Sequence, residues 1–374
     1  MSKLKKIAPF ILILVIMLNA LSSTNAQNVI EPAIRLRIME TTDLHANMIG
    51  FDYEKNKPKI EYGFARTASL IKEARKEEPN TLLFDVGDVL VGNALGEYAY
   101  LSHYLNPHDI HPVFKAMNLL NYDAATVGNH EFNYGLDFLQ VSLQGANFPY
   151  VNANIYIDDH NDFEGDDLNY FNPYIILDRQ LTDSNGKKQT LKVGVIGFIT
   201  PITAEWDKEY FQDKLIVKNI KKTAEHFVPI MKDKGADIII ALAHVGMEAD
   251  KGLKEQKGNS VFDLSEVEGI TAILYGHSHA LFPSDDGHIE KGIDHKTGTI
   301  NGTPAVQAGF WGNHLGIIDL DLIQVDGKWV VKSSQSSVRP IFQTINNNKI
   351  PIANEDPDIV KAIMYSHIEA LMNK

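Results

Sequence analysis

The chain contains no cysteine among its 374 residues. This absence excludes disulfide bonds, thiolate zinc sites and a cysteine nucleophile. No apolar run after residue 26 is long enough to span a membrane. Apolar residues nevertheless make up 44% of the chain and charged residues 22%, which is close to ordinary soluble composition. A sizeable hydrophobic core is therefore expected.

Positive charge is also scarce. There are 35 lysine and arginine residues against 48 acidic residues, which gives a net charge of -13 at pH 7. A protein this acidic repels polymeric nucleic acid and anionic lipid surfaces, so we expect neither as a partner. If the chain handles phosphate, it needs a local positive centre, and bound metal is the obvious candidate.

The first 26 residues differ from the rest. Three lysines precede an apolar run at residues 7–18, and small or polar residues follow up to Ala26. This order is typical of a secretory signal peptide cleaved after Ala26, with an uncleaved N-terminal anchor as the alternative. Cleavage removes three lysines and no acid, which takes the net charge from -13 to -16. We predict an exported protein, located in a periplasm, outside the cell or in the cell wall, without stable membrane insertion after cleavage.

From residue 33 onward, strands alternate with helices. Strands are predicted at 33–40, 81–86, 124–127, 149–153, 191–196, 238–243 and 270–275, and helices at 63–77, 113–120, 136–143 and 220–234. This alternation predicts an α/β fold. Three later strands, at 303–309, 316–322 and 328–334, have no helices between them and predict a mixed or antiparallel sheet. The polar segment 154–172 lacks the spacing of a calcium loop and is predicted to be a solvated acidic loop.

Residues of metal-ligand type follow five of the predicted strands. The segments are Thr41-Thr42-Asp43-Leu44-His45, Gly87-Asp88, Gly128-Asn129-His130-Glu131, His244-Val245-Gly246 and Gly276-His277-Ser278-His279. Each alone is a weak signal, since a single buried histidine is usually a hydrogen-bonded core residue. The carboxyl ends of strands in α/β sheets form ligand-binding crevices. We therefore expect the five segments to meet at one edge and bind metal.

The mixture of imidazole, carboxylate and amide groups suits zinc, manganese, iron or a similar transition metal better than calcium. Two divalent ions about 3.5–4 Å apart need a shared ligand, and a carboxylate is the natural bridge. A water between such ions becomes a nucleophilic hydroxide near neutral pH, and the ions neutralise phosphoryl oxygens. Two divalent metal ions are therefore the predicted cofactors.

The chain carries, in this order, the motifs DLH, GD, GNHE, an isolated histidine after an apolar strand, and GHSH. The calcineurin-like metallophosphoesterases have these motifs in the same order, and the chain resembles them. Longer stretches are similar to the bacterial 2′,3′-cyclic-nucleotide 2′-phosphodiesterase/3′-nucleotidases, relatives of the secreted 5′-nucleotidases. These stretches are RIMETTDLHANMIGFDY (37–53), DIHPVFKAMN (109–118), VGNHEFNYGLDFL (127–139) and FPYVNANI (148–155). The resemblance covers about residues 33–345 and implies a four-layer αββα sandwich with two mixed sheets.

The resemblance also implies a role for each ligand. The first ion is held by Asp43, His45 and His279, the second by Asn129, His244 and His277, and both are bridged by Asp88. His130 is the implied catalytic imidazole, which contacts the phosphoryl group and assists the leaving oxygen. Glu131 is expected to orient its loop. The segment containing Trp311 and His314 is placed near the metal edge.

Two residues separate the branches of the family. The 5′-nucleotidase relatives carry an aspartate at the position of Asn133, paired with the histidine, and often a glutamine at the position of His279. An amide orients the imidazole without adding a charge. Both residues favour the cyclic-phosphodiesterase/3′-nucleotidase branch, and Asn133 is included among the candidate catalytic positions.

The predicted domains are a signal peptide at 1–26, a catalytic domain at 33–345 and a linker with a terminal helix at 346–374. Family members of this type continue into a C-terminal nucleotide-binding domain whose aromatic residues enclose the base. We expect that domain to be missing from this protein, which predicts a higher KM and a relaxed base preference. A separate chain that carries it is a candidate partner. The apolar face of the terminal helix is predicted to be exposed or paired with another chain, and it consists of Ile359, Ile363, Ile368 and Leu371.

The sequence thus predicts a secreted dinuclear-metal phosphoesterase that hydrolyses 2′,3′-cyclic nucleotides and 3′-nucleotides, in nucleotide catabolism or phosphate scavenging. A metal-bound hydroxide attacks phosphorus in this hypothesis, and the substrate partner is a small nucleotide. Two alternatives stay open. One is a 5′-nucleotidase or nucleotide-sugar hydrolase on the same scaffold. The other is a non-catalytic truncated remnant that binds metal or a partner chain.

Overall fold

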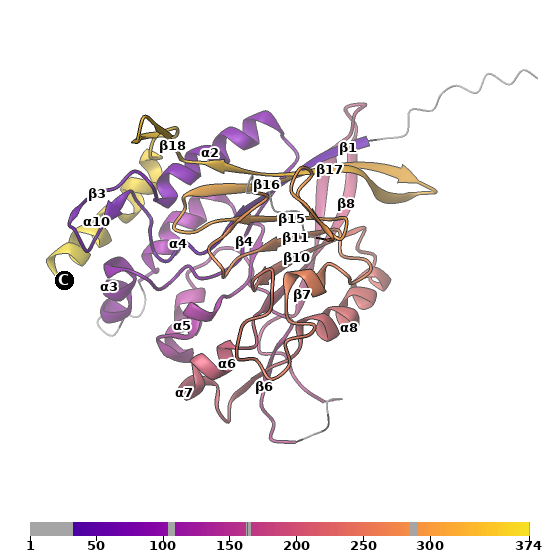
Figure 1. The fold of residues 1–374 in the computed structure, drawn as a ribbon, viewed down its shortest axis with the longest axis horizontal. Helices are drawn as coiled ribbons and strands as arrows, with labels where there is room; N and C mark the ends of the chain where they lie inside the picture. The colour runs from indigo at the N-terminus through magenta and orange to yellow at the C-terminus, as the bar shows by residue number, and fades with distance from the viewer. Residues whose placement is uncertain (1–32, 104–108, 162, 164–165, 285–290, 374) are drawn as a thin grey trace, which may run out of the picture. The chain divides into compact units, whose positions relative to one another are not determined.

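The computed structural model describes residues 33–103, 109–161, 163, 166–284 and 291–373 (Figure 1). The predicted signal peptide at 1–26 lies outside these ranges, so its cleavage and the exported location stay predictions. Within the described ranges, no helix has both the length and the apolar character needed to cross a bilayer.

The first sheet is mixed, with strand order β17-β16-β1-β4-β5. Its strands are β1 (Ala33–Thr41), β4 (Thr81–Asp85), β5 (Ala124–Ala125), β16 (His314–Val325) and β17 (Lys328–Pro340). β1 runs parallel to β4 and antiparallel to β16, and β4 runs parallel to β5. Side chains of β1 point alternately to the two faces of the sheet, so that Leu36 and Ile38 lie in one core cluster and Met39 lies in another.

The second sheet has the order β13-β14-β15-β11-β10-β8-β7, with β12 paired to β15. Its strands are β7 (Tyr174–Thr182), β8 (Lys188–Ile199), β10 (Ile238–His244), β11 (Ala272–Tyr275), β12 (Leu281–Phe282), β13 (Ile293–Asp294), β14 (Thr299–Ile300) and β15 (Thr303–Ala308). β8, β10, β11 and β15 are parallel, whereas β7 is antiparallel to β8. Every residue of β10 is buried, which explains its unbroken apolar sequence.

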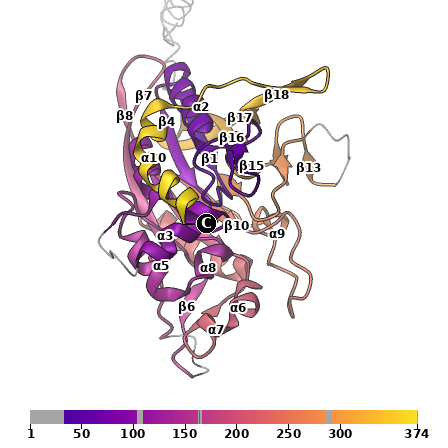
Figure 2. The same ribbon diagram turned by 90° about the vertical axis from the view of Figure 1, so that its left-hand side faces the viewer.

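Helices cover the outer face of each sheet (Figures 1 and 2). The helices on the first sheet are α2 (Phe64–Glu77), α3 (Ala94–His103), α4 (Pro112–Met117), α5 (Gly135–Leu143) and α10 (Pro357–Met372), and those on the second are α8 (Ile220–Asp233) and α9 (Val261–Leu264). Two hydrophobic clusters join helices to sheets, and a third lies between the sheets. Three apolar layers between four structural layers confirm the predicted αββα sandwich with two mixed sheets.

Shorter elements complete the described fold. Three strand pairs lie outside the main sheets: β2 (Phe51–Asp52) with β3 (Lys57–Pro58), β6 (Ile155–Ile157) with β9 (Leu215–Val217), and β18 (Phe342–Ile345) with β19 (Asn348–Pro351). The short helices are η1 (Asn118–Leu120), η2 (Asn129–Phe132), α6 (Thr203–Trp206) and α7 (Lys208–Phe211).

Two sequence predictions are wrong in part. The segment 149–153 is no regular strand, because only Tyr150 forms a bridge, with Ala125. The segment 154–172 is not solvated throughout, because it begins with the buried Asn154 and with β6. The Asn154 side chain donates to the carbonyl of Ile199 and accepts from its N–H, and these bonds hold the segment against the second sheet.

The apolar face of α10 is largely covered by its own chain. Ile359 and Ile363 are fully buried, and the helix contacts α2, α3 and α4. The expectation that this face is exposed or paired with another chain is therefore wrong for these two residues. It holds for Ile368, which is 48% exposed, and Leu371 is half-buried. The Asp356 carboxylate caps the helix by accepting from the N–H of Ile359. The domain boundary at residue 345 and a separate partner chain stay predictions.

Candidate metal centre

The five polar segments converge because the strands before them end at the same edge. In the first sheet, the parallel register aligns Thr41 with Asp85, and Asp85 with Ala125. The loops that follow carry Asp43, His45, Asp88, Asn129 and His130. In the second sheet, β10 ends at His244, and the turn after the parallel strand β11 carries His277 and His279. The predicted ligands therefore come from both sheets of the sandwich.

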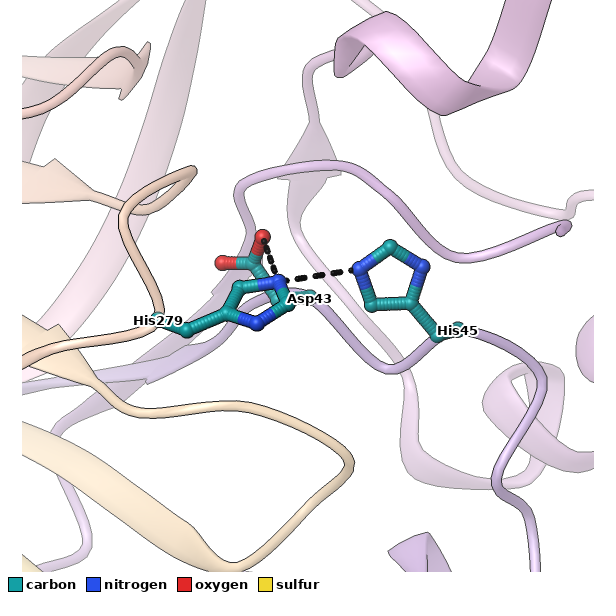
Figure 3. A group of neighbouring side chains, drawn as sticks. All are labelled: Asp43, His45 and His279. Atoms are coloured by element: carbon teal, nitrogen blue, oxygen red, sulfur yellow. Dashed lines mark hydrogen bonds and ion pairs between the residues drawn. The ribbon is translucent and has the colours of Figure 1, made fainter. Parts of the chain in front are cut away.

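One group of ligand atoms contains Asp43, His45 and His279, as predicted for the first ion (Figure 3). The two imidazoles point toward each other, with their Nε2 atoms 3.1 Å apart. The Nε2 atom of His279 lies 3.4 Å from Oδ1 of Asp43. Two imidazole nitrogens and a carboxylate thus face one small volume, which is an arrangement that can bind a divalent cation.

A second group contains Asp43, Asp88 and His244. The Nε2 atom of His244 is 3.1 Å from Oδ2 of Asp88 and 3.9 Å from Oδ1 of Asp43. Asp88 also lies 3.8 Å from Nε2 of His45, so both aspartates face both groups. The other two predicted ligands meet each other, with Nδ1 of His277 at 3.0 Å from Oδ1 of Asn129. The rings of His277 and His244 are 5.3 Å apart.

The buried atoms of this centre fit a cation. His244 is fully buried, and its Nε2 atom forms no hydrogen bond of good geometry among the described residues. Burial disfavours a charge on this ring, but the nearby carboxylates outweigh burial and raise the pKa of His244 to about 10. Burial acts against the charge of Asp88 as well, yet His244 and His45 hold the pKa of Asp88 below its usual range. The buried aspartates thus favour positive charge between them.

Most predicted ligands adopt a strained backbone conformation. Asp43, His45, Asp88, His277 and His279 all have positive φ angles, between 47° and 73°. For a residue other than glycine, this conformation costs about 1–2 kcal/mol. Such strain is typical of functional sites, where the surrounding structure fixes it. Here it turns each loop sharply as it leaves its strand.

Backbone carbonyls hold two of the histidine rings on the side that faces away from the metal centre. Nδ1 of His45 contacts the carbonyl of Val91, and Nδ1 of His244 contacts the carbonyl of Val86, both at 2.8 Å. These contacts leave Nε2 of each ring facing the centre. His277 is turned the other way, since its Nε2 atom lies 3.1 Å from Oδ1 of Asp250. Asp250 was not identified from the sequence, although it follows His244 by only six residues.

Glu131 joins two of the ligand loops. Its buried carboxylate accepts from four backbone N–H groups, at distances of 2.6 to 3.1 Å, which belong to Asp88, Val89, Leu90 and Gly128. The loop-orienting role expected for Glu131 is therefore consistent with its contacts. It couples the positions of Asp88 and Asn129.

His130 begins a hydrogen-bonded chain of three side chains. Its Nδ1 atom lies 2.6 Å from Oδ1 of Asn133, and Nδ2 of Asn133 donates to Oδ1 of Asp207 at 2.9 Å. A carboxylate accepts only from the amide nitrogen, so Asp207 sets the orientation in which Asn133 presents oxygen to the ring. The sequence shows no motif around Asp207, which lies 74 residues beyond Asn133. The ring of His130 is 5.1 Å from that of His45.

The late segment around Trp311 also reaches the centre. The N–H of Trp311 donates to the carbonyl of Asp43 at 2.7 Å, and Phe310 stacks on His279 with ring centroids 4.9 Å apart. His314 contacts Oδ1 of Asn313, and burial lowers the pKa of His314 to about 4. The predicted location of this segment near the metal edge is thus confirmed.

Known proteins resemble this chain in sequence and in fold. The family model for calcineurin-like phosphoesterases matches residues 36–281. The 2′,3′-cyclic-nucleotide 2′-phosphodiesterase/3′-nucleotidase of Salmonella typhimurium is 45% identical over 347 residues, which cover 93% of this chain and 52% of that protein. A 5′-nucleotidase of Diplobatis ommata is 26% identical over 357 residues, covering 88% of this chain and 55% of that protein. The chain spans about half the length of each relative.

Among solved structures, the calcineurin-like phosphoesterase YfkN from Bacillus subtilis superposes with a TM-score of 0.82. It is 41% identical in sequence, and the match covers 91% of this chain and 99% of that chain. The fold described above therefore extends over nearly all of a solved relative.

Proposed function

Because the chain belongs to the calcineurin-like phosphoesterase family, we propose that it is an exported, metal-dependent phosphoesterase that hydrolyses 2′,3′-cyclic nucleotides and 3′-nucleotides. The observation that carries the metal chemistry is the buried Nε2 atom of His244, which faces two aspartates and has no hydrogen bond of good geometry to any residue that the structure describes. The higher identity to the cyclic-nucleotide enzyme than to the 5′-nucleotidase supports the substrate class. The basic and apolar first 26 residues support export.

The ligand roles in this proposal follow the contacts. Asp43, His45 and His279 would hold one ion, and His244, His277 and Asn129 the other. Asp88 would lie between the ions, and the position of Asp43 in both groups makes its carboxylate a second candidate for sharing. When bound, the two ions supply positive charge for phosphoryl oxygens and an activated water for attack on phosphorus.

His130 would act on the leaving oxygen. Its Nδ1 side faces Asn133, so its Nε2 atom is the one that can contact substrate. A ring protonated at both nitrogens donates from Nε2 to the oxygen that leaves phosphorus, while the amide of Asn133 fixes the plane of the ring. Asp207 acts through Asn133 and positions it.

Rates on three substrates test this proposal. The mature chain is assayed with manganese on 2′,3′-cyclic AMP, 3′-AMP and 5′-AMP at equal concentrations. We expect turnover of the first two and much slower turnover of 5′-AMP. Faster hydrolysis of 5′-AMP would support the 5′-nucleotidase alternative. No turnover of any of them, or of bis-p-nitrophenyl phosphate, would support a non-catalytic metal-binding chain.

A further inference from the structure

A cleft of about 680 Å³ opens beside the group of Asp43, His45 and His279. Part of its lining comes from Asn47, the segment 91–94, Tyr134 and Trp311. The β2–β3 hairpin and Tyr62, which contacts Trp311, provide more of it. We call this feature the aromatic cleft. The proposed function does not assign it a role.

The aromatic cleft is attached directly to the metal ligands. The Trp311 N–H donates to the carbonyl of Asp43 at 2.7 Å, and Nδ2 of Asn93 donates to the carbonyl of His45 at 3.1 Å. Gly92 lies so close to His45 that an added Cβ atom would be 2.6 Å from the Cβ of that histidine. The cleft therefore lies next to the metal-ligand loop, within reach of a molecule whose phosphoryl group is at the metal centre.

Aromatic side chains provide much of the lining, and their neighbours hold them in place. They are Phe51, Tyr53, Tyr62, Tyr134 and Trp311. Tyr62 meets Trp311 edge to face at 5.2 Å, and Trp311 meets Phe310 at 5.1 Å. Tyr134 stacks on Tyr100 at 4.0 Å. Rings fixed in this way lose little conformational freedom when a planar ligand binds.

The charges of the cleft select against a second phosphate. Three acidic residues line it, Asp52, Glu54 and Glu97, against two lysines. Both lysines already pair with acids, Lys55 with Asp52 at 3.3 Å and Lys59 with Glu61 at 2.8 Å. An anionic ligand group would therefore meet net negative charge, whereas an uncharged planar group would not.

We propose that the aromatic cleft binds the nucleoside part of the substrate, with the base stacked against its aromatic side chains. This inference rests on the proposed function for the position of the phosphoryl group. It gives the described domain a base-binding surface of its own. It also implies that a nucleotide with an additional 5′-phosphate binds less well than one without it.

The first test measures binding of adenosine, which lacks the reacting group. Calorimetric titration of the metal-loaded chain is compared with the Trp311→Ala and Tyr62→Ala variants. Stacking of a base is worth about 1–3 kcal/mol, so we expect the dissociation constant to rise about tenfold in each variant. Tyr365→Ala is the matched control, because that tyrosine is 70% exposed on α10 and should leave binding unchanged. Absence of adenosine binding to the wild-type chain would overturn the proposal.

The second test separates the cleft from the metal centre. Each variant is assayed on 2′,3′-cyclic AMP and on glycerol 1,2-cyclic phosphate, which has no base. We expect the KM for the nucleotide to rise about tenfold, and by several times more than the KM for the glycerol ester. Equal losses on both esters in Trp311→Ala and Tyr62→Ala would contradict the proposal, because they would indicate damage to the metal centre.

The two proposals fail in different ways. Adenosine binding that the cleft variants weaken, in a chain that hydrolyses no nucleotide, would support the cleft and reject the proposed function. Nucleotide hydrolysis with a KM that neither variant changes would do the reverse. The charge argument has its own readout: adenosine 3′,5′-bisphosphate should show a higher KM than 3′-AMP, and a lower one would contradict it.

Discussion

The two ligand groups of the candidate centre differ in the solvent exposure of their histidine side chains. His244 in the second group is fully buried, and the side chain of His277 is 11% exposed. In the first group, His45 is nearly buried, but the side chain of His279 is 39% exposed. The ring of His279 stacks on Phe310, which contacts Trp311 of the aromatic cleft. One group is enclosed by backbone and carboxylate contacts, and the other is open.

This difference suggests different tasks for the two groups. An enclosed site with orienting contacts behind each ligand keeps its geometry fixed and favours tight metal binding. An open site lets substrate approach and exchanges its ion more readily. We therefore expect the second group to bind metal more tightly, and the first to be the side on which substrate enters. The following variants test this comparison.

The largest effect is expected from Asp88→Asn, because Asp88 faces both groups. Loss of one buried negative charge weakens both ion sites, and we expect turnover to fall on the order of 10³-fold or more. Metal content by mass spectrometry and turnover of bis-p-nitrophenyl phosphate measure this. Asp326→Asn, at an exposed turn, is the matched control. Full turnover in Asp88→Asn would refute the proposed mechanism.

A pair of histidine variants compares the groups directly. His244→Ala removes an enclosed ligand, and we expect loss of one ion and a drop in turnover of about 100-fold or more. In His279→Gln, the amide oxygen can replace the exposed imidazole, so we expect a loss of about tenfold at most. Metal stoichiometry and turnover of both variants are measured side by side. Equal losses would show that depth of burial does not distinguish the two groups.

Asp250→Asn affects only the second group. The carboxylate lies 3.1 Å from Nε2 of His277 and accepts from the hydroxyl of Thr200 at 2.6 Å. Loss of such an orienting partner typically costs about 10–100-fold in metal affinity, so we expect weaker binding on this scale. A two-step metal titration by calorimetry should show the tighter step weakened and the other unchanged. A change confined to the weaker step would reverse the assignment.

The smallest effects are expected around His130. Asn133→Asp places a second carboxylate against Asp207, where the present contact is 2.9 Å, and we expect kcat to fall about tenfold. Adding Asp207→Asn restores a donor and acceptor pair and should recover most of that loss. Nitrogen NMR of the His130 ring provides a second readout of its orientation. If the double variant is worse than either single variant, Asp207 does not act through Asn133.

The sequence predicted the parts of the site that follow strands. Asp43, Asp88 and His244 are recognisable because each follows an apolar run, and parallel strands bring such positions to one edge. Asp250 and Asp207 could not be found in this way, because they lie in loops and gain a role only through distant residues. The sequence also showed the apolar face of α10 but not what covers it, since burial of Ile359 and Ile363 depends on helices far away in the chain.

Two of the longer elements that the sequence did not predict, α3 and β7, were missed for local reasons. α3 (Ala94–His103) begins next to a glycine-containing turn, contains Gly96 and has no clear polar face, so its helical periodicity is weak. β7 (Tyr174–Thr182) lies at the sheet edge, where its residues are mostly half-exposed, so its pattern is weak. By contrast, β10 was predicted from its apolar run alone, because it is buried on both faces.

The contacts of Glu131 also determine how the centre opens. Its carboxylate accepts from the N–H groups of Asp88, Val89, Leu90 and Gly128, which belong to two different loops. None of these amides can exchange its hydrogen with solvent while the buried carboxylate is in place, so all four should exchange as one cooperative unit. We therefore expect the two loops to open together, with Asp88 and Asn129 displaced in the same step.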